Sequence, residues 1–492
     1  MQLLEGVQAP IVLADRFDGS RIATGVAPGL QRLGVMLPYS PLHLLFMQGV
    51  ARLRIDAVVA TSGNVSGEPI CIDDDEAPEW LADIADTFLT HNRGIARPVD
   101  DSVVQLLPGQ RWPQSRKPPQ PMVLRRGRGY APAPVVTGLF ARRPRVVGLG
   151  GQLNASVAHV SDGTATVSQY LGDLHQMATL RRLHTTAAEL PALLGAESEV
   201  YAHDQHPDYE STHLAARLGA SAHLEAVQHH HAHVAACLAE HGMTGPALDV
   251  AWDGTGYGPD GTVWGGELLV ADLVGYRRLG SLRPLPLPGA EQAVHEPRRV
   301  ALAVWRKLAG DAEWERLPPD LAGMFSATEA RVLGRMLASG VASPWTSSAA
   351  AESGVDAAAA RLLPPATGWR ADWRPMMARL VDLSGIPEQR GLVVLAFHRA
   401  LAATIQRWCR RARGAGLGGR VVALGILGAT LLPDNWQWVV WWVPFYWIYD
   451  VLEGVFTRTI GWGTFVWKTA LTVGLSALFV LLARKKIVAG LS

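Results

Sequence analysis

Short apolar runs separated by turn-forming residues mark the first hundred positions of the chain. Residues 57–60 form such a run before a Thr-Ser-Gly-Asn turn, and residues 82–89 form another before a second polar turn. A further run at 122–126 follows a stretch rich in proline, glutamine and basic residues, which predicts an exposed loop at 107–121. The alternation predicts a mixed α/β region whose strands end in loops that carry polar groups.

A longer succession of apolar segments follows. Residues 146–151 predict a buried strand that enters a glycine turn, and residues 165–168 predict the next strand of a hairpin. Helical periodicity runs from 176 to 193, and another buried strand is predicted at 247–252, directly before an Asp-Gly-Thr-Gly turn. Strand, hairpin, helix and strand in this order predict an α/β fold that contains parallel strands. No internal repeat is visible in the sequence.

The last part of the chain has a different character. Residues 337–375 are rich in alanine, serine and proline, and an amphipathic helix is predicted at about 393–413. Residues 465–483 are uncharged except for Lys468, are long enough to span a bilayer, and precede an Arg-Lys-Lys cluster. They predict a transmembrane helix with its C-terminus in the cytoplasm. The aromatic segment 436–456 predicts an interfacial helix or a kinked span, with a buried core helix as the alternative.

Composition over most of the chain fits a globular protein of two or three domains, with 492 residues of which 48% are hydrophobic and 18% charged. The formal net charge of +1 provides no overall field that would recruit nucleic acid. The three cysteines, Cys71, Cys237 and Cys409, form no Cys-x-x-Cys pair, so neither a zinc finger nor a disulfide framework is indicated. Seven of the 17 tryptophans lie between Trp436 and Trp467, which separates the tail from the rest. The N-terminal residues predict no secretory signal.

Four histidines within five residues form the most distinctive motif: His229, His230, His231 and His233. The alanine, leucine and glutamate residues after them favour a helix, and Gly242 is a suitable helix end. On a helix, residues four apart face the same way, so His229 and His233 could share one metal ion. His230 and His231 would point elsewhere, towards a substrate or a group that supports the ligands. A purely structural role for the histidines is the alternative.

A second motif, Asp253-Gly254-Thr255-Gly256, directly follows the predicted strand at 247–252. Glycines let backbone N–H groups approach phosphate oxygens closely, and a carboxylate at a strand end can bind a metal. Asp-Gly turns are common between strands, but this one lies shortly after the histidines and before a Trp-Gly-Gly-Glu stretch at 264–267. The sequence therefore predicts nucleotide or metal binding at this turn.

The third motif is the polar loop at residues 61–69, which contains Ser62 and Asn64. Hydroxyl and amide groups on a tight loop can hold a phosphate or a carbamoyl group, although an ordinary turn has the same composition. The positive charge opposite such a ligand could come from four arginines, Arg93, Arg125, Arg126 and Arg128.

These segments together resemble the maturation carbamoyltransferase family of nickel–iron hydrogenases, HypF. The resemblance covers about residues 9–310 and, more faintly, 370–405. It is carried by ordered stretches at residues 33–43, 61–69, 100–104, 125–132, 168–174, 203–209, 227–242 and 253–267.

The resemblance implies an α/β protein in three parts. These are a partial YrdC-like carbamoyl-adenylate domain at 1–135, an incomplete actin/sugar-kinase-like (ASKHA) carbamoyltransferase domain at 143–424, and a membrane-associated tail at 425–492. In this family carbamoyl phosphate and ATP give carbamoyl-adenylate, and the carbamoyl group passes to the C-terminal cysteine of a HypE partner. A cytoplasmic protein is implied, with the tail as a membrane tether. A related reading is an O-carbamoyltransferase of secondary metabolism.

Carried over to this sequence, the resemblance also implies a set of site residues. His229, His233 and Asp253 would bind a divalent metal, and two histidines with one carboxylate suit zinc or iron. Residues His230 and His231 are the catalytic candidates. The candidates for nucleotide binding are Ser62, Asn64, Arg93, Arg125, Asp253, Gly254, Thr255 and Gly256.

The sequence also departs from the family pattern. The acylphosphatase-like domain, the zinc fingers and the start of the YrdC-like domain are not found, and Asn154 stands where the family usually has lysine. After residues 421–424 the family's glycine-rich nucleotide loop and final metal-binding aspartate are replaced by a tail that resembles an ABC-2-type transporter permease. We therefore expect impaired activity, with a non-catalytic remnant and a membrane-tethered fusion as the alternatives.

Overall fold

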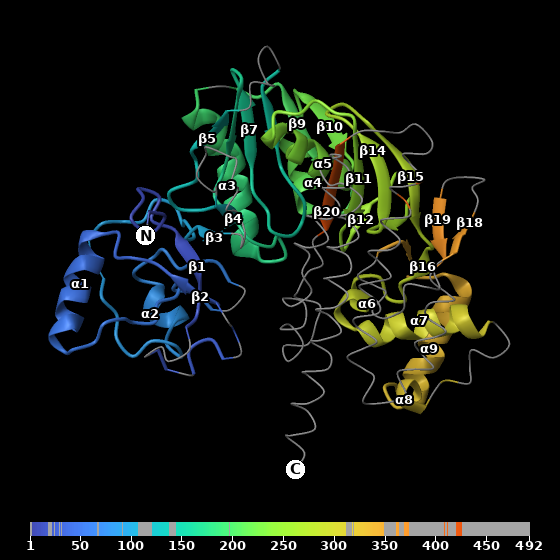
Figure 1. Ribbon diagram of the computed structural model, residues 1–492, viewed down its shortest axis with the longest axis horizontal. Coiled ribbons are helices and arrows are strands. Elements are labelled where there is room, and N and C mark those ends of the chain that lie inside the picture. The colour runs from blue at the N-terminus through green and yellow to red at the C-terminus, as the bar shows by residue number, and fades with distance from the viewer. Residues whose placement is uncertain are drawn as a thin grey trace, which may run out of the picture. The chain divides into compact units, whose positions relative to one another are not determined.

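The computed structural model describes residues 2–106 except 18–21, 24, 29, 31, 66–67 and 91, followed by 121–136, 144–310 except 196, 317 and 319–348. Beyond these it describes strands at 361–363, 369–372 and 420–425 together with residues 408 and 411 (Figure 1). The chain forms two compact units, residues 1–232 with 239–243 and residues 233–238 with 244–492.

The first sheet of the N-terminal unit has four strands in the order β2-β1-β3-β4. Their bounds are Ile11–Asp15 (β1), Arg32–Val35 (β2), Val103–Gln105 (β3) and Met122–Arg125 (β4). Strand β1 pairs antiparallel with β2 and parallel with β3. Helix α1 (Pro41–Arg52) begins where the hydroxyl of Ser40 accepts a hydrogen bond from the His43 N–H, and a proline occupies its first turn.

The region between β2 and β3 contains fewer strands than the apolar runs predict. Helix α1 buries none of its residues, and the next helix, α2 (Ala77–Trp80), is a single turn. Residues 57–60 are exposed and form no strand, and residues 82–89 are irregular and mostly exposed. The strand predictions there are wrong because a strand needs a neighbouring strand to pair with, and local composition does not supply one. The strand predicted at 122–126 is confirmed as β4.

The second sheet of this unit has six strands in the order β10-β9-β6-β7-β8-β5. Their bounds are Pro134–Val136 (β5), Val146–Gly148 (β6), Ala158–Ser161 (β7), Thr164–Val167 (β8), Val200–Asp204 (β9) and His223–Val227 (β10). Strands β6, β7 and β8 are antiparallel, whereas β9 pairs parallel with both β6 and β10. Strand β8 confirms the strand predicted at 165–168, but its hairpin partner is β7, which the sequence did not predict, and not β6. The predicted parallel pairing is confirmed.

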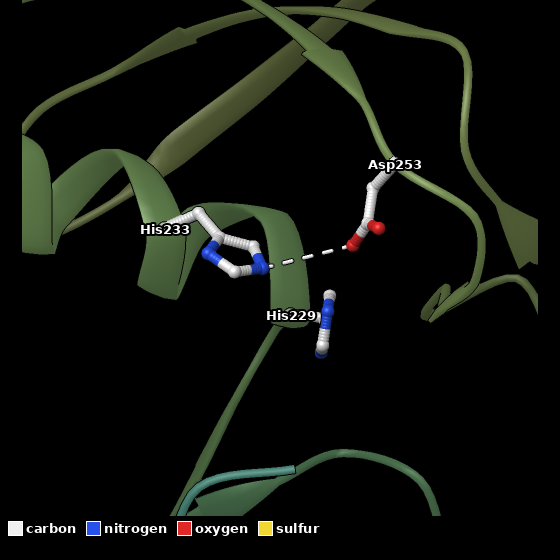
Figure 2. Close-up of side chains that lie close together, drawn as sticks. All are labelled: His229, His233 and Asp253. Atoms are coloured by element: carbon white, nitrogen blue, oxygen red, sulfur yellow. Dashed lines mark ion pairs between the residues drawn. The ribbon is translucent and has the colours of Figure 1, made fainter. Parts of the chain in front are cut away.

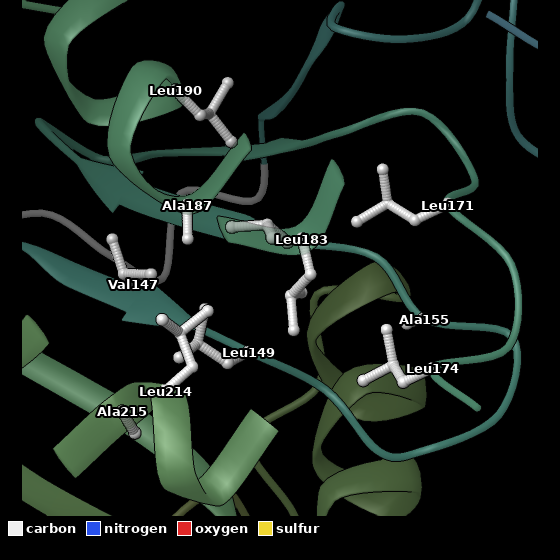
Figure 3. Packing of buried hydrophobic residues seen from close by; sticks show 11 residues of the cluster. Val147, Leu149, Ala155, Leu171, Leu174, Leu183, Ala187, Leu190, Leu214 and Ala215 are labelled. Carbon is white, nitrogen blue, oxygen red and sulfur yellow. The ribbon is translucent and has the colours of Figure 1, made fainter. Parts of the chain in front are cut away.

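Two helices cover this sheet and bury its apolar core. Helix α3 (Met177–Leu193) confirms the predicted helix, and helix α4 (Glu210–Leu218) follows β9. One face of α3 presents Leu183, Ala187 and Leu190, whose spacing of four and three residues places them on the same side of a helix. Figure 3 shows this face against Val147 of β6 and Leu214 of α4, residues that belong to the same buried cluster. The core therefore fixes the strands whose ends carry the site.

The other unit is built on a second six-stranded sheet, ordered β18-β19-β15-β14-β11-β20. Its strands are Ala247–Trp252 (β11), Glu267–Ala271 (β14), Tyr276–Leu282 (β15), Arg361–Leu363 (β18), Trp369–Asp372 (β19) and Arg420–Gly425 (β20). The predicted strand 247–252 is confirmed as β11, and β20 pairs parallel with it along its whole length.

A small sheet and four helices complete the described part of this unit. The small sheet contains Gly256–Tyr257 (β12), Val263–Trp264 (β13), Leu285–Pro286 (β16) and Trp345–Thr346 (β17). The helices are Glu291–His295 (α6), Pro297–Ala309 (α7), Pro319–Ala322 (α8) and Ala327–Ser339 (α9). Ser326 and Glu329 form a reciprocal capping box at the start of α9, and Gly340 ends it in the left-handed conformation.

The two six-stranded sheets repeat one connectivity. In one, β6 begins an antiparallel β6-β7-β8 meander and has β9 parallel on its other side. In the other, β11 begins the antiparallel β11-β14-β15 meander and has β20 parallel on its other side. The sequence shows no repeat because the topology recurs without the residues recurring.

Several predictions for the C-terminal part lie outside the described residues. They are the amphipathic helix at 393–413, of which only residues 408 and 411 are described, the aromatic segment 436–456 and the transmembrane helix at 465–483. Among the helices that the structure describes, none combines the length and apolar character needed to cross a bilayer.

Candidate functional site

Helix α5 (His229–Glu240) carries the histidine motif and begins two residues after β10 ends. The predicted helix is confirmed, and Gly242 with a φ of 63° follows its last turn. His229 and His233 lie one turn apart, so both rings project from one side of the helix (Figure 2). The helix thus fixes the spacing of two candidate ligands by its pitch alone.

Asp253, the third candidate ligand, directly follows β11. Its backbone N–H donates to the carbonyl of Gly265 at 3.1 Å, and its carbonyl accepts from the Ser348 hydroxyl at 3.3 Å. The Gly254 N–H donates to Oδ1 of Asp253 at 2.6 Å. These bonds hold the carboxylate at the end of the strand.

The structure brings His229, His233 and Asp253 together, with one potential ligand atom from each lying within 4.8 Å of the others. Nε2 of His233 lies 3.6 Å from Oδ2 of Asp253, and Figure 2 shows the ring and the carboxylate facing each other. The three side chains are 20%, 49% and 31% exposed, respectively, so solvent or a substrate can reach the group. Two imidazoles and one carboxylate fit a divalent transition metal that keeps positions open for other ligands.

His230 and His231, the catalytic candidates, are both buried, with exposures of 1% and 9%. The Gln228 side chain lies 3.4 Å from Nδ1 of His230 and accepts from the backbone N–H of His231 at 2.9 Å. The rings of His229 and His230 meet edge to face with centroids 5.6 Å apart. The two histidines thus pack behind the ligand pair, and a role in catalysis stays a prediction.

The glycine turn after Asp253 leaves open space on one side. A Cβ added to Gly254 would meet no atom within 4 Å, whereas Gly256 is buried at the start of β12. Thr255 between them is partly buried. Backbone N–H groups here could approach a phosphate closely, which keeps the nucleotide prediction physically reasonable.

Behind this turn, the Trp-Gly-Gly-Glu stretch packs tightly. A Cβ on Gly265 would lie 2.5 Å from the Asp253 carbonyl oxygen, so only glycine fits there. Glu267 is fully buried, is bonded to Arg278 at 2.6 Å and accepts from the Ser347 hydroxyl. Burial raises the pKa of Glu267, while Arg278 opposes that shift.

The loop at 61–69 closes on itself through its own polar groups. The Ser62 hydroxyl donates to the Asn64 side-chain oxygen at 2.5 Å, and the Asn64 amide donates to the carbonyls of Val65 and Glu68 at 2.9 and 3.0 Å. Ser62 is exposed, and Asn64 is partly buried. The loop is therefore a pre-formed turn. Its residue types suit both alternatives from the sequence, a loop that holds a phosphate or carbamoyl group and an ordinary turn.

The arginines predicted to face this loop have separate positions. Arg125 donates to the carbonyl of Asp101 at 2.9 Å, and Arg93 is exposed in the segment between α2 and β3. Arg128 forms an ion pair with Asp101 at 2.8 Å and lies over the Tyr39 ring at 3.4 Å. Among the described contacts, none joins Arg125 or Arg128 to the loop, so their role in binding a nucleotide stays a prediction.

One residue near the metal candidates received no role from the sequence. Asp204, the last residue of β9, lies in the stretch at 203–209, and its carboxylate contacts Nδ1 of His229 at 2.7 Å. The signal in the sequence was an aspartate at the end of a strand, which alone is too common to identify a site.

Three family models match the chain. The model described as "HypF Kae1-like domain" matches residues 141–240, "Carbamoyltransferase, Kae1-like Domain, second subdomain" matches 249–362, and the Sua5/YciO/YrdC family, described as "Telomere recombination", matches 2–127.

Curated relatives point to the same family. Carbamoyltransferase HypF of Synechocystis sp. is 41% identical over 312 residues, which cover 63% of this chain and 38% of the relative. Carbamoyltransferase HypF2 of Cupriavidus necator is 42% identical, covering 70% and 43%. A HypF homolog of Cupriavidus necator is 35% identical over 300 residues, covering 53% of this chain and 76% of the relative. The chain spans about two fifths of the length of the first two relatives.

Solved structures agree with this result. Full-length HypF in a phosphate- and nucleotide-bound form superimposes with a TM-score of 0.72 at 29% identity, covering 86% of this chain and 68% of that one. HypF of T. kodakarensis superimposes with a TM-score of 0.69 at 26% identity, covering 85% and 58%.

Proposed function

Because the chain belongs to the HypF carbamoyltransferase family, with YrdC-like and Kae1-like domains, we propose that it uses carbamoyl phosphate and ATP to carbamoylate a HypE-like protein. The transfer would pass through carbamoyl-adenylate and end on the acceptor's C-terminal cysteine during nickel–iron hydrogenase maturation. The observation that carries the proposal is the group of His229, His233 and Asp253 beside the glycine turn.

We divide the reaction between the two domains. Residues 1–135 would form the carbamoyl-adenylate, with Ser62, Asn64 and Arg93 at its nucleotide. Residues 143–424 would carry out the transfer.

A tail at 425–492 that tethers the chain to the cytoplasmic membrane is a separate proposal from the sequence alone. Carbonate washing of membranes from cells that express the full chain tests it.

The roles of the residues at the transfer site follow from their chemistry. His229, His233 and Asp253 would hold a divalent zinc or iron ion, which when bound supplies a Lewis acid at the open face of the site. Backbone N–H groups of the 254–256 turn would bind the adenylate phosphate. The acceptor thiolate would attack the carbamoyl carbon, and AMP would leave with the electrons of the broken C–O bond.

The test is acceptor-dependent release of AMP and transfer of the carbamoyl group, followed by mass spectrometry of a HypE-like acceptor. The purified full chain is compared with His233→Ala and with His241→Ala, an exposed histidine just after the same helix. We expect slow transfer that is lost in His233→Ala and retained in His241→Ala. Equal transfer by both variants would refute the site, transfer only to a small-molecule hydroxyl would favour O-carbamoylation, and metal binding without turnover would identify a remnant.

A further inference from the structure

The carboxylate of Asp204 is one of the most enclosed charged groups of the described chain, with 5% of its side chain exposed. Both oxygens have a defined partner. The backbone N–H of His206 donates to Oδ1 at 2.8 Å, and Nδ1 of His229 lies 2.7 Å from Oδ2. The carboxylate therefore contacts the first residue of helix α5 from a strand 25 positions earlier in the chain.

The backbone around Asp204 is fixed as firmly as its side chain. Strands β9 and β10 run parallel with Asp204 opposite Val227, so the last residues of both strands lie next to each other. The hydroxyl of Thr212 in α4 donates to the carbonyls of Asp204 and His206 at 3.1 and 2.9 Å. The backbone of Asp204 cannot shift without breaking these bonds, and rotation of the carboxylate would break the hydrogen bond from the His206 N–H, so His229 meets an acceptor in a preset position.

The identity of this acceptor decides which nitrogen of His229 carries the proton. A carboxylate only accepts hydrogen bonds, so Nδ1 of a neutral His229 must be the protonated nitrogen. The lone pair is then on Nε2, so a metal would bind through that nitrogen. Histidine ligands in metal sites commonly donate their other N–H to a carboxylate in this way.

We infer that Asp204 is a positioning residue that holds His229 in the Nδ1-protonated tautomer and thereby presents its Nε2 to a divalent metal ion together with His233 and Asp253. This inference rests on the metal site of the proposed function and adds a residue outside the ligand set. The alternative is a buried polar pair that stabilises the fold and has no effect on the metal.

Asp204→Asn separates the two readings because it keeps the shape and reverses one hydrogen bond. The asparagine oxygen can still accept from His206, while its NH₂ group would face Nδ1 of His229 and donate to it. A neutral His229 would then carry its proton on Nε2 and could not bind a metal through that atom. Asp208→Asn is the matched control because it removes the same charge from an exposed residue four positions later.

The measurement is the dissociation constant for Zn²⁺, determined in the full chain by competition with a chromogenic chelator, with the melting temperature recorded for each variant. We expect Asp204→Asn to weaken binding about 10–100-fold, with Asp208→Asn unchanged and His229→Ala losing the site. Equal affinity of Asp204→Asn and Asp208→Asn would overturn the inference alone. Unchanged affinity in both His229→Ala and His233→Ala would overturn the metal site as well.

A second measurement reads the tautomer in the wild-type protein itself, and a variant is needed only to assign the signals. Histidine labelled with ¹⁵N reports the tautomer directly, and the His229 resonances are assigned by their absence in His229→Ala. We expect the metal-free wild-type protein to show His229 protonated at Nδ1. A dominant Nε2-protonated form would overturn the inference.

Discussion

Asp249 on β11 offers a quantitative test of how the buried sheet tolerates charge. It is fully buried, pairs in register with Leu269 of β14 and Val422 of β20, and its carboxyl oxygens accept no hydrogen bond from any other described side chain. Burial raises the pKa of this carboxyl well above its ordinary value of 3.8. The perturbation we choose is Asp249→Asn, which keeps the shape and removes the titration.

The magnitude follows from linkage between protonation and folding. A folded-state pKa above the unfolded value means that folding takes up a proton, so the stability from this group is complete below the unfolded pKa and is lost as pH rises towards the folded pKa. Between the ordinary value of 3.8 and pH 7, at about 1.4 kcal/mol per pH unit, the loss is at most about 4.5 kcal/mol. Wild-type stability should therefore fall relative to Asp249→Asn as pH rises.

The assay is urea unfolding of the full chain between pH 5 and pH 8, together with hydrogen exchange of peptides that cover β11. We expect the free-energy difference between Asp249→Asn and wild type to grow by up to about 1.4 kcal/mol per pH unit. Glu291→Gln, which removes an exposed carboxylate in the same unit, should show no such trend. A difference that stays constant across this pH range would refute the reasoning.

Two further substitutions test the packing behind Asp253. Gly265→Ala should weaken Zn²⁺ binding at least several-fold, because its Cβ would lie 2.5 Å from the Asp253 carbonyl oxygen. Gly275→Ala, which has open space around its Cβ, should leave Zn²⁺ binding unchanged. Equal dissociation constants for the two variants would contradict this prediction. Arg278→Met should destabilise the protein by about 2–4 kcal/mol, because it leaves the Glu267 carboxylate buried without its cation, and an unchanged urea midpoint would show that Glu267 is neutral in the fold.

The parts of the fold that the sequence predicted are those that depend on local pattern. Strand β11 and helix α3 follow from the apolar pattern, and helix α5 follows from helix-favouring residue types that end at Gly242. The helical pitch alone predicts that His229 and His233 lie on the same side of helix α5. Residues 57–60 have the composition of a strand yet form none, because their state depends on whether a partner strand lies beside them.

The residues that support the candidate ligands could not be found this way. The two histidine ligands are a rare residue type at a helical spacing, and Asp253 stands out because it opens a glycine turn after a predicted strand. Asp204, Gly265 and Ser348 lack such a signal and reach the site through strand register and loop packing. Asp204 contacts His229 because β9 and β10 are parallel and end in register, with the helix beginning two residues later. The pattern that would identify such a positioning residue is therefore an aspartate at the end of one parallel strand. The neighbouring strand must lead into a helix that carries the histidine ligands. This pattern requires the strand order, which the sequence alone does not supply.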